Sequence, residues 1–217
     1  MSAARANPPT RGPFITFEGS DGVGKSTQVA RLAARLRASG LEVLSTREPG
    51  GSPGAEAIRA LLVEGGADRW SPLAEALLVF AARADHLERT INPARARGCA
   101  VICDRFTDST RAYQGAAGGL GSEAVEALNR LVVGEDAPNL TIILDAPSAE
   151  TISRAEKRGA ASRFEAKGPA FQERVRAAFL AIARAEPARC ALVDATASAD
   201  IVEAEIASIV RARLAIG

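Results

Sequence analysis

The sequence predicts an α/β fold in which helices flank a parallel sheet of five strands. Short apolar segments alternate with helical patterns along the chain, which is typical of successive β-α-β units. The apolar character of the short segments is continuous rather than alternating, as expected for strands covered on both faces. A length of 217 residues suits one domain of ordinary size with a sizeable core.

Each expected element follows from one of these patterns. The short apolar segments predict strands at Phe14–Glu18, Glu42–Thr46, Ala100–Asp104, Thr141–Asp145 and Ala191–Asp194. Apolar residues at helical spacing predict helices at Ser26–Ala38, Ala55–Val63, Leu73–Arg95, Glu123–Val133, Ala149–Lys157, Phe171–Arg184 and Ala199–Leu214. We expect residues 1–11 to be a disordered tail, residues 12–217 a single domain, and the segment near 159–168 a mobile lid.

The composition argues against several classes of partner. A formal net charge of +1 gives no basic field for nucleic-acid binding, and no apolar run approaches the ~18 residues of a membrane span. The N-terminal residues lack the apolar core of a signal peptide. The cysteines at 99, 103 and 190 have neither a CxxC nor a metal-ligand spacing, and we expect them to be buried thiols. These features predict a cytoplasmic protein that contacts neither membranes nor nucleic acid.

The strongest motif follows the first predicted strand and precedes the first predicted helix. It reads GSDGVGKS and matches G-x-x-x-x-G-K-[ST], the phosphate-binding P-loop. Its glycines let backbone N–H groups point inward, and the helix N-terminus adds partial positive charge. The residues expected to bind ATP are Gly19, Ser20, Asp21, Gly22, Val23, Gly24, Lys25, Ser26 and Thr27. Lys25 should reach the β- and γ-phosphates, and the Ser26 hydroxyl should bind Mg²⁺.

An Asp-Arg pair at the end of the third predicted strand adds to this site. Ligands of open α/β sheets bind at the carboxyl ends of the strands, where Asp104 and Arg105 stand. The Asp104 carboxylate can bind Mg²⁺ or its waters, and Arg105 can contact two phosphate oxygens. No lysine follows an asparagine, so the guanine-reading N-K-x-D segment of GTPases is absent. A small P-loop kinase is the favoured class.

Several segments in this order and spacing resemble thymidylate kinases, a family of nucleoside-monophosphate kinases, over Gly12–Leu214. The matching segments are FEGSDGVGKST, TREPGGSPGAEAIRALL, FAARADHL, VICDRFTDSTRAYQG, and LDAPSAETISRAEKRG with SRFE. The resemblance implies a P-loop fold of the nucleoside-monophosphate kinase type, ATP and Mg²⁺ as cofactors, and a homodimer. It also implies the reaction of thymidine monophosphate with ATP to give thymidine diphosphate, a step of dTTP biosynthesis.

The resemblance also implies roles for individual residues in the acceptor site. Asp21 would bond the deoxyribose 3′-hydroxyl, and Arg59 and Arg105 would contact the acceptor phosphate and its surroundings. Arg83 would bond the thymine edge, and Tyr113 would crowd the sugar 2′-position. The remaining candidates are Glu48 and Pro49 as one wall of the pocket, and Ser109, Thr110 and Gln114 as polar groups around the base.

Two positions depart from the family pattern. The base-stacking phenylalanine usually stands four residues before the arginine that matches Arg83, where this chain has Val79 with Phe80 next to it. Either Phe80 turns into the pocket, which makes it a candidate substrate-binding residue, or Val79 supplies a smaller apolar wall. Ser162 stands where relatives often have aspartate before Arg-Phe-Glu.

The variable positions of the P-loop carry no basic residue, as in the family members that supply a catalytic arginine from the lid. Arg154, Arg158 and Arg163 flank the expected lid and are the candidates. A guanidinium there would stabilise charge on the transferring phosphoryl oxygens, and a closed lid would exclude water. Lys25 and Arg105 complete the expected catalytic set.

The acceptor would need no general base. A phosphate monoester has its second pKa near ~6 and is already anionic at neutral pH, so positioning and positive charge suffice. The single histidine, His86, is accordingly interpreted as structural or surface-exposed. Two alternatives remain: a kinase for another nucleoside monophosphate, and a regulatory protein that binds ATP without transferring phosphate.

Overall fold

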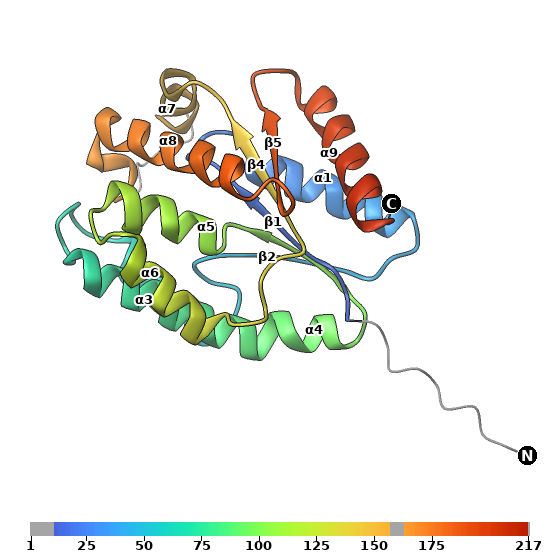
Figure 1. Ribbon diagram of the computed structural model, residues 1–217, viewed down its shortest axis with the longest axis horizontal. Helices are drawn as coiled ribbons and strands as arrows, with labels where there is room; N and C mark the ends of the chain where they lie inside the picture. The colour runs from blue at the N-terminus through green and yellow to red at the C-terminus, as the bar shows by residue number, and fades with distance from the viewer. Residues whose placement is uncertain (1–10, 157–162, 217) are drawn as a thin grey trace, which may run out of the picture.

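The computed structural model describes residues 11–156 and 163–216, and its centre is a sheet of five parallel strands. The strand order is β2-β3-β1-β4-β5 (Figure 1). The strands are β1 (Phe14–Glu18), β2 (Val43–Arg47), β3 (Ala100–Asp104), β4 (Leu140–Asp145) and β5 (Cys190–Asp194). The predicted α/β class and parallel sheet are confirmed. Strand β2 is shifted by one residue at both ends relative to its prediction, and β4 and β5 each begin one residue earlier than predicted.

Helical segments connect the strands and cover the sheet. In chain order they are α1 (Lys25–Ala38), α2 (Pro53–Val63), α3 (Pro72–His86), η1 (Leu87–Ile91), α4 (Asn92–Ala96), α5 (Thr107–Thr110), η2 (Arg111–Ala117), α6 (Ser122–Val132), α7 (Ser148–Glu156), η3 (Glu165–Lys167), α8 (Pro169–Ala185) and α9 (Ala199–Leu214). Helices α2 and α3 each begin with a Ser-Pro pair, in which the serine Oγ accepts a backbone N–H and the proline occupies the first turn. In the described ranges no helix has the length and apolar character needed to cross a bilayer.

Two helical regions differ from the sequence prediction. The single helix expected at Leu73–Arg95 is divided, because the π-helical η1 separates α3 from α4. The run α5–η2 was not predicted, since its polar and small residues lack the apolar repeat of a long amphipathic helix. This run carries much of the cavity wall described below.

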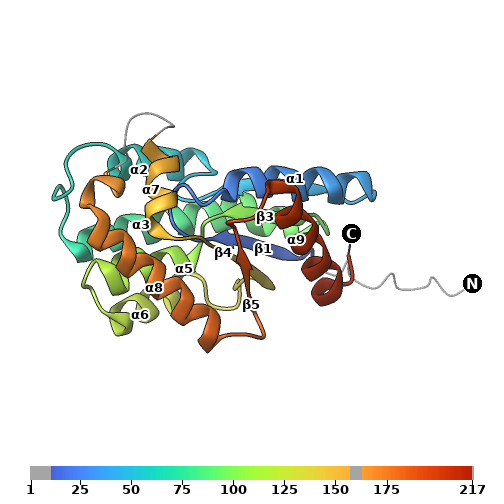
Figure 2. The ribbon, with the colours of Figure 1, turned by 90° about the horizontal axis from the view of Figure 1, so that it is seen from above.

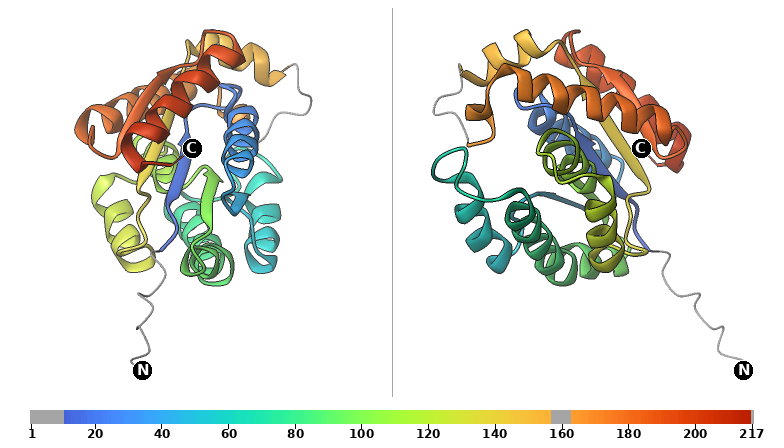
Figure 3. Two further views of the ribbon diagram at one scale, coloured as in Figure 1. Left: turned by 90° about the vertical axis from the view of Figure 1, so that its right-hand side faces the viewer. Right: turned by 60° about the vertical axis from the view of Figure 1, so that its left-hand side comes forward.

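Helices cover both faces of the sheet. Helices α1 and α9 lie side by side over one face (Figure 2), where Ile15, Phe17 and Ile102 pack with Leu36 of α1 and Val202 of α9. Segments η1, α4, η2 and α8, which lie between α1 and α9 in the chain, pack on the opposite face. The strands therefore run through the middle of the molecule (Figure 3). Strands β1, β3 and β4 therefore have the predicted burial on both sides, whereas the edge strands β2 and β5 each keep exposed residues.

Successive strand residues alternate between the two faces. Phe14, next to Ile15, packs on the opposite face with Val101, Cys103 and Ile91. A further cluster on that face joins Ile143 and Cys190 of the sheet to Tyr113 of η2 and Phe171, Val175 and Phe179 of α8. All three cysteines are buried and free.

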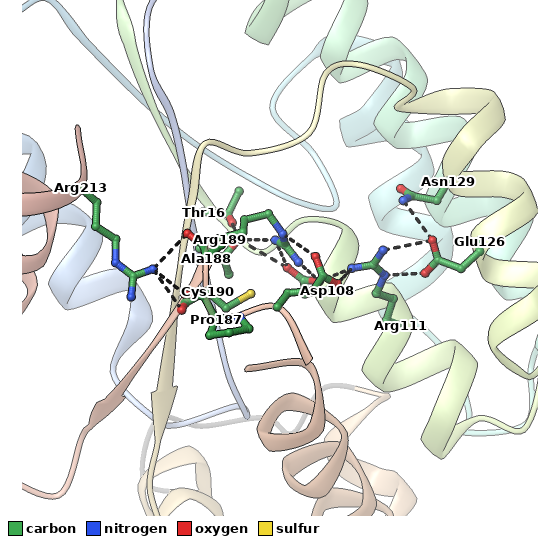
Figure 4. Close-up of polar contacts among 12 residues, drawn as sticks. Thr16, Asp108, Arg111, Glu126, Asn129, Pro187, Ala188, Arg189, Cys190 and Arg213 are labelled. Atoms are coloured by element: carbon green, nitrogen blue, oxygen red, sulfur yellow. Dashed lines mark hydrogen bonds and ion pairs between the residues drawn. The ribbon is translucent and has the colours of Figure 1, made fainter. Parts of the chain in front are cut away.

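A buried polar network fixes the position of α5 and η2 on the sheet (Figure 4). Asp108, which is fully buried, accepts two hydrogen bonds from Arg189, at 2.7 and 3.0 Å, and one from Arg111 at 3.0 Å. Arg111 also donates to both carboxylate oxygens of Glu126 on α6. Arg189 donates to Thr141 of β4 as well. The turn before β5, the central sheet and α6 are thereby tied to the helical run that reaches the cavity.

Candidate active site

A cavity of about 530 Å³ opens at the carboxyl edge of β1, β2 and β3, where parallel α/β sheets bind ligands. It brings together these residues that the sequence analysis singled out: Asp21, Gly22, Gly24, Lys25, Ser26, Thr27, Glu48, Pro49, Arg59, Arg83, Asp104, Arg105, Ser109, Thr110, Tyr113 and Gln114. Three further members of the P-loop, Gly19, Ser20 and Val23, are buried within the loop itself.

The loop after β1 requires glycine at defined positions. Gly19, Gly22 and Gly24 have φ values of 130°, 83° and 104°, a region that favours glycine. A Cβ on Gly19 would also stand 2.4 Å from the carbonyl oxygen of Leu144. Gly24 directly precedes α1, so the loop leads the first N–H groups of that helix to the cavity.

Lys25 is the buried cation of this loop. Its Nζ donates to the carbonyl oxygens of Gly19 at 3.0 Å and Ser20 at 2.8 Å. Burial, followed by the nearby charge of Arg105, lowers the pKa of Lys25 to about 8. The loop carbonyls thus hold the Lys25 side chain at the cavity, and nearby charges shift its pKa.

Ser26 and Asp104 meet at the same edge. The Ser26 Oγ donates to Asp104 Oδ2 at 2.7 Å, which joins the first turn of α1 to the end of β3. In the described part of the chain, no group of three or more His, Cys, Asp or Glu is placed to hold a metal ion. A hydroxyl and one carboxylate nevertheless fit Mg²⁺, which usually takes few protein oxygens and completes its shell with water and phosphate.

Arg105 contacts several parts of the site from a constrained backbone. Its φ of 70° is uncommon for a residue other than glycine. Its Nη1 donates to Gly19 O at 3.0 Å and Ser109 Oγ at 2.9 Å. Its Nη2 donates to Asp21 Oδ1 at 2.7 Å and Tyr113 Oη at 3.2 Å. The guanidinium therefore joins the P-loop to the α5–η2 run.

The charge of Arg105 acts on its neighbours. Burial alone would raise the pKa of Asp21, but Arg105 and Lys25 outweigh it and the pKa falls to about 2. The hydroxyl of Tyr113 donates to Asp21 Oδ2 at 3.1 Å, and burial raises the pKa of the tyrosine. Asp21 is consequently a fixed anion that orients both partners.

Glu18, at the end of β1, supports this arrangement from behind and was not among the predicted site residues. It is fully buried, and its two carboxyl oxygens accept from Phe106 N at 2.8 Å and Ser109 Oγ at 2.6 Å. Burial, then the charge of Asp108, raises its pKa to about 7. The sequence feature that could have indicated it is a carboxylate at the last position of an apolar strand, directly before the P-loop.

Arg83 forms a buried cluster at another part of the cavity wall. Its Nε donates to Glu48 Oε2 at 2.7 Å and its Nη2 to Thr110 Oγ1 at 3.0 Å. Its Nη1 is buried without a hydrogen-bond partner among the described residues. His86 lies behind, with Nδ1 donating to Glu48 at 3.1 Å and Nε2 2.8 Å from Thr46 Oγ1. The only histidine is therefore a buried structural residue.

Arg59 adds a further guanidinium. Its Nη1 donates to the carbonyl oxygen of Pro49 at 2.6 Å, which connects α2 to the segment after β2. Burial and the nearby charge of Arg47 lower the pKa of Arg59. Arg47 also lines the cavity and was not among the predicted site residues.

Phe80 does not turn into the cavity, which was one of the two arrangements considered from the sequence. Val79 lines the cavity, whereas Phe80 is buried in the interior, where its ring lies 4.9 Å from the Arg83 guanidinium carbon. One helix position rotates a side chain by about 100°, which accounts for the opposite placement of these neighbours. Phe106 and Phe164 also line the cavity and were not predicted to do so.

Arg163 does not stand where a catalytic lid arginine was expected. It is buried outside the cavity wall, with Nε donating to Leu62 O at 2.9 Å and Nη1 to Ala67 O at 3.1 Å, while Nη2 pairs with Glu75. The N–H groups of Arg163 thus bond to residues that are far away in sequence. Arg158 lies outside the described residues, and the side chain of Arg154 does as well.

Sequence comparisons identify known proteins that are similar to this chain. A family model described as thymidylate kinase matches residues 17–206. The chain is 58% identical to the thymidylate kinase of Caulobacter vibrioides over 205 residues, covering 94% of this chain and 99% of that protein. It is 52% identical to the thymidylate kinase of Ruegeria pomeroyi, covering 94% and 96% of the two chains.

A solved structure shows the same architecture. The crystal structure of thymidylate kinase from Ehrlichia chaffeensis superposes with a TM-score of 0.73 at 34% sequence identity. The match covers 93% of this chain and 99% of the other.

Proposed function

The chain belongs to the thymidylate kinase family and phosphorylates thymidine monophosphate, and we propose that the cavity at the carboxyl edge of the sheet is where it does so. The observation that carries the proposal is the buried guanidinium of Arg83. An unpaired buried donor costs about 1–3 kcal/mol, and its Nη1 has no partner among the described residues of the chain. A carbonyl oxygen on the base of a bound nucleotide would satisfy it.

The donor nucleotide binds at the P-loop. The family uses ATP, generally with Mg²⁺, and the loop Gly19–Thr27 supplies backbone N–H groups and Lys25 for the phosphates. Ser26 and Asp104 would hold Mg²⁺, which when bound neutralises charge on the phosphate oxygens. Lys25 and the start of α1 bring positive charge to the same place.

The acceptor phosphate binds between two partly buried guanidinium groups that line the cavity, those of Arg59 and Arg105. Arg105 is held by Asp21, Ser109 and Tyr113, so its guanidinium is already oriented when the acceptor arrives. Preorganised charge of this kind lowers the barrier because no reorganisation is needed as charge develops. Asp21 and Tyr113, which also line the cavity, would contact the deoxyribose.

The base binds at the opposite part of the wall. Val79 supplies an apolar surface, and Arg83, Thr110 and Gln114 supply polar groups. Arg83 is fixed by Glu48 on one side and Thr110 on the other. A rigid donor that finds its partner only in the bound base favours pyrimidines with a carbonyl at that position.

The chain's own residues carry the transfer by positioning and charge. A monoester phosphate is mostly dianionic at neutral pH and needs no base to remove a proton, so approach and alignment dominate. Lys25 and Arg105 stabilise charge on the transferring group. Arg154 and Arg158 remain the candidates for a further guanidinium from the lid.

The assembly proposed is a homodimer. Large apolar side chains are exposed on two helices that contact each other, with Leu73 and Leu77 on α3 and Leu131 on α6. Such a face is more often covered in solution than left to water. Sedimentation at micromolar concentration should give about twice the mass of 22.5 kDa, and a single species of 22.5 kDa would contradict the dimer.

Arg83→Lys tests the base assignment directly. Lysine keeps the positive charge next to Glu48 but cannot donate in several fixed directions, so KM for thymidine monophosphate should rise at least about tenfold. KM for ATP should stay within about twofold, because Arg83 is not part of the P-loop. Equal KM values for the acceptor in the variant and the parent chain would contradict the assignment.

A further inference from the structure

We propose that Glu75 is a positioning residue that fixes the orientation of the Gln114 amide and thereby sets the preference for thymine over cytosine. The inference rests on the proposed function, because it requires the base to bind beside Arg83 and Gln114. Glu75 itself does not line the cavity. It acts through a side chain that does.

The contact between the two residues has only one chemically sensible direction. Gln114 is buried, and its Nε2 donates to Glu75 Oε1 at 2.9 Å. A carboxylate offers acceptors alone, whereas an amide has a donor end and an acceptor end. A flipped Gln114 would place its oxygen against a carboxylate oxygen and leave both without a proton. Glu75 therefore holds the NH₂ end and leaves the carbonyl end of Gln114 for the cavity.

The carboxylate is itself held firmly. Glu75 is 2% exposed, and its Oε2 pairs with the buried Arg163. The ammonium of Lys167 stands 3.6 Å from the same oxygen. These contacts fix the direction of the Glu75 carboxylate, so it has little freedom to turn toward Gln114 in another way. Arg163, which lies outside the cavity wall, thus holds the residue that contacts Gln114.

The consequence is a fixed order of polar groups in the cavity wall. Arg83 and Gln114 both line the cavity. Arg83, whose Nη1 has no partner among the described residues, would supply a donor, and Gln114, whose Nε2 is held by Glu75, would supply its carbonyl oxygen as an acceptor. Thr110, which accepts from Arg83, and Gln114 stand four positions apart on the α5–η2 run, so both face the same side. Thymine and uracil carry a carbonyl beside an N3–H and match this order. Cytosine carries an amino group beside a bare N3 and presents the reverse order, which leaves both wall groups unpaired.

Glu75→Gln removes the constraint with almost no change in size. A glutamine at 75 can donate to the Gln114 oxygen or accept from its nitrogen, so both orientations of Gln114 become acceptable. We expect the kcat/KM ratio for thymidine over deoxycytidine monophosphate to fall at least about tenfold. The ratio for thymidine over deoxyuridine monophosphate should stay within about twofold, because these bases share the same polar edge.

A merely structural role would lower all three activities by a similar factor and leave both ratios unchanged, which would overturn the inference. Glu203→Gln is the matched control, since it removes an arginine-paired carboxylate on α9, away from the cavity and from the α5–η2 run. It should change neither ratio. Where activity with deoxycytidine monophosphate is too weak, its inhibition constant against thymidine monophosphate gives the same comparison.

The double variant shows whether Glu75 acts through Gln114. In a Gln114→Ala background, Glu75→Gln should leave the thymidine-to-deoxycytidine ratio unchanged, because the residue it positions is gone. A tenfold fall in that background as well would contradict the mechanism. If Glu75→Gln does not fold, Glu75→Asp provides the test: the shortened carboxylate should lower the ratio in the parent chain and not in the Gln114→Ala chain.

Different results would contradict the proposed function and the role of Glu75. A parent chain that shows no preference for thymidine monophosphate would overturn the proposed function. A parent chain with that preference whose Glu75→Gln variant keeps the same ratio would overturn only the role of Glu75.

Discussion

The guanidinium of Arg105 donates to Asp21 Oδ1 at 2.7 Å and thereby joins the end of β3 to the P-loop. The same group reaches Ser109 and Tyr113 on the following helical run. The P-loop and the segment from the end of β3 into η2, which are distant in sequence, thus meet at one planar cation. We propose that this junction sets the position of the acceptor relative to the ATP phosphates.

Arg105→Lys should therefore reduce kcat more than it reduces stability. Lysine supplies one compact charge and cannot hold Gly19, Asp21 and Ser109 in the same plane. We expect kcat to fall about 10²- to 10³-fold, as when one preorganised group of a charged transition state is lost. Steady-state kinetics with thymidine monophosphate checks this, and Arg89→Lys on an exposed i,i+4 pair serves as control. A kcat within threefold of the parent value would contradict a central role for Arg105.

Glu18 should make stability depend on pH in a specific window. Its pKa is raised from an ordinary 4.5 to about 7 in the folded protein, so the folded state keeps a proton that the unfolded state loses. The stabilisation is complete below about pH 4.5 and is lost as pH rises through about 7. Glu18→Gln should remove this dependence.

Denaturant unfolding of both proteins at several pH values between 4.5 and 7 measures the effect. Relative to the variant, the parent chain should lose unfolding free energy as pH rises, by at most about 1.4 kcal/mol per pH unit. Parallel curves for the two proteins would show that Glu18 does not titrate in this range.

Gly19→Ala should disturb the P-loop more than the same change at Gly40 disturbs its turn. Both glycines have positive φ, at 130° and 85°, and such a conformation costs another residue about 1–3 kcal/mol. Only at Gly19 does the added Cβ meet backbone, 2.4 Å from Leu144 O; nothing lies within 4 Å at Gly40. Thermal unfolding should show the larger loss for Gly19→Ala, and ATP affinity should fall for that variant alone. Equal losses at the two positions would argue against the steric account.

Val79 and Phe80 should separate binding from stability although they are adjacent. Val79→Ala removes apolar wall from the cavity and should raise KM for thymidine monophosphate several-fold. Phe80→Leu should instead lower the unfolding free energy by about 1–2 kcal/mol, since Phe80 is 2% exposed in the interior. Its effect on KM should be smaller than that of Val79→Ala. The reverse assignment of effects would place the phenylalanine on the base.

Local sequence patterns predicted the parts of the site that are local in structure. The P-loop could be identified because its glycines, Lys25 and Ser26 are consecutive and stand between a strand and a helix. Asp104 and Arg105 could be placed because parallel strands end at one edge of the sheet. In both cases the residues that form the binding feature are neighbours in the sequence, so a local pattern is enough to identify them.

Contacts between distant segments could not be predicted in the same way. Arg163 pairs with Glu75 and with carbonyls of Leu62 and Ala67, and no spacing in the sequence links these positions. The α5–η2 run lacks an apolar repeat, and ion pairs of the buried Asp108 with Arg111 and Arg189 help to hold it in place. Its position depends on tertiary packing, which outweighs local propensity.

The most direct test of the account is to incubate the protein with ATP, Mg²⁺ and each nucleoside monophosphate in turn and to quantify the diphosphates formed. Lys25→Ala is the blank, because it removes the buried cation of the P-loop. We predict thymidine diphosphate far above every other product, and none from the Lys25→Ala variant. A preference for a different monophosphate, or equal product with Lys25→Ala, would contradict the central claim that this cavity phosphorylates thymidine monophosphate.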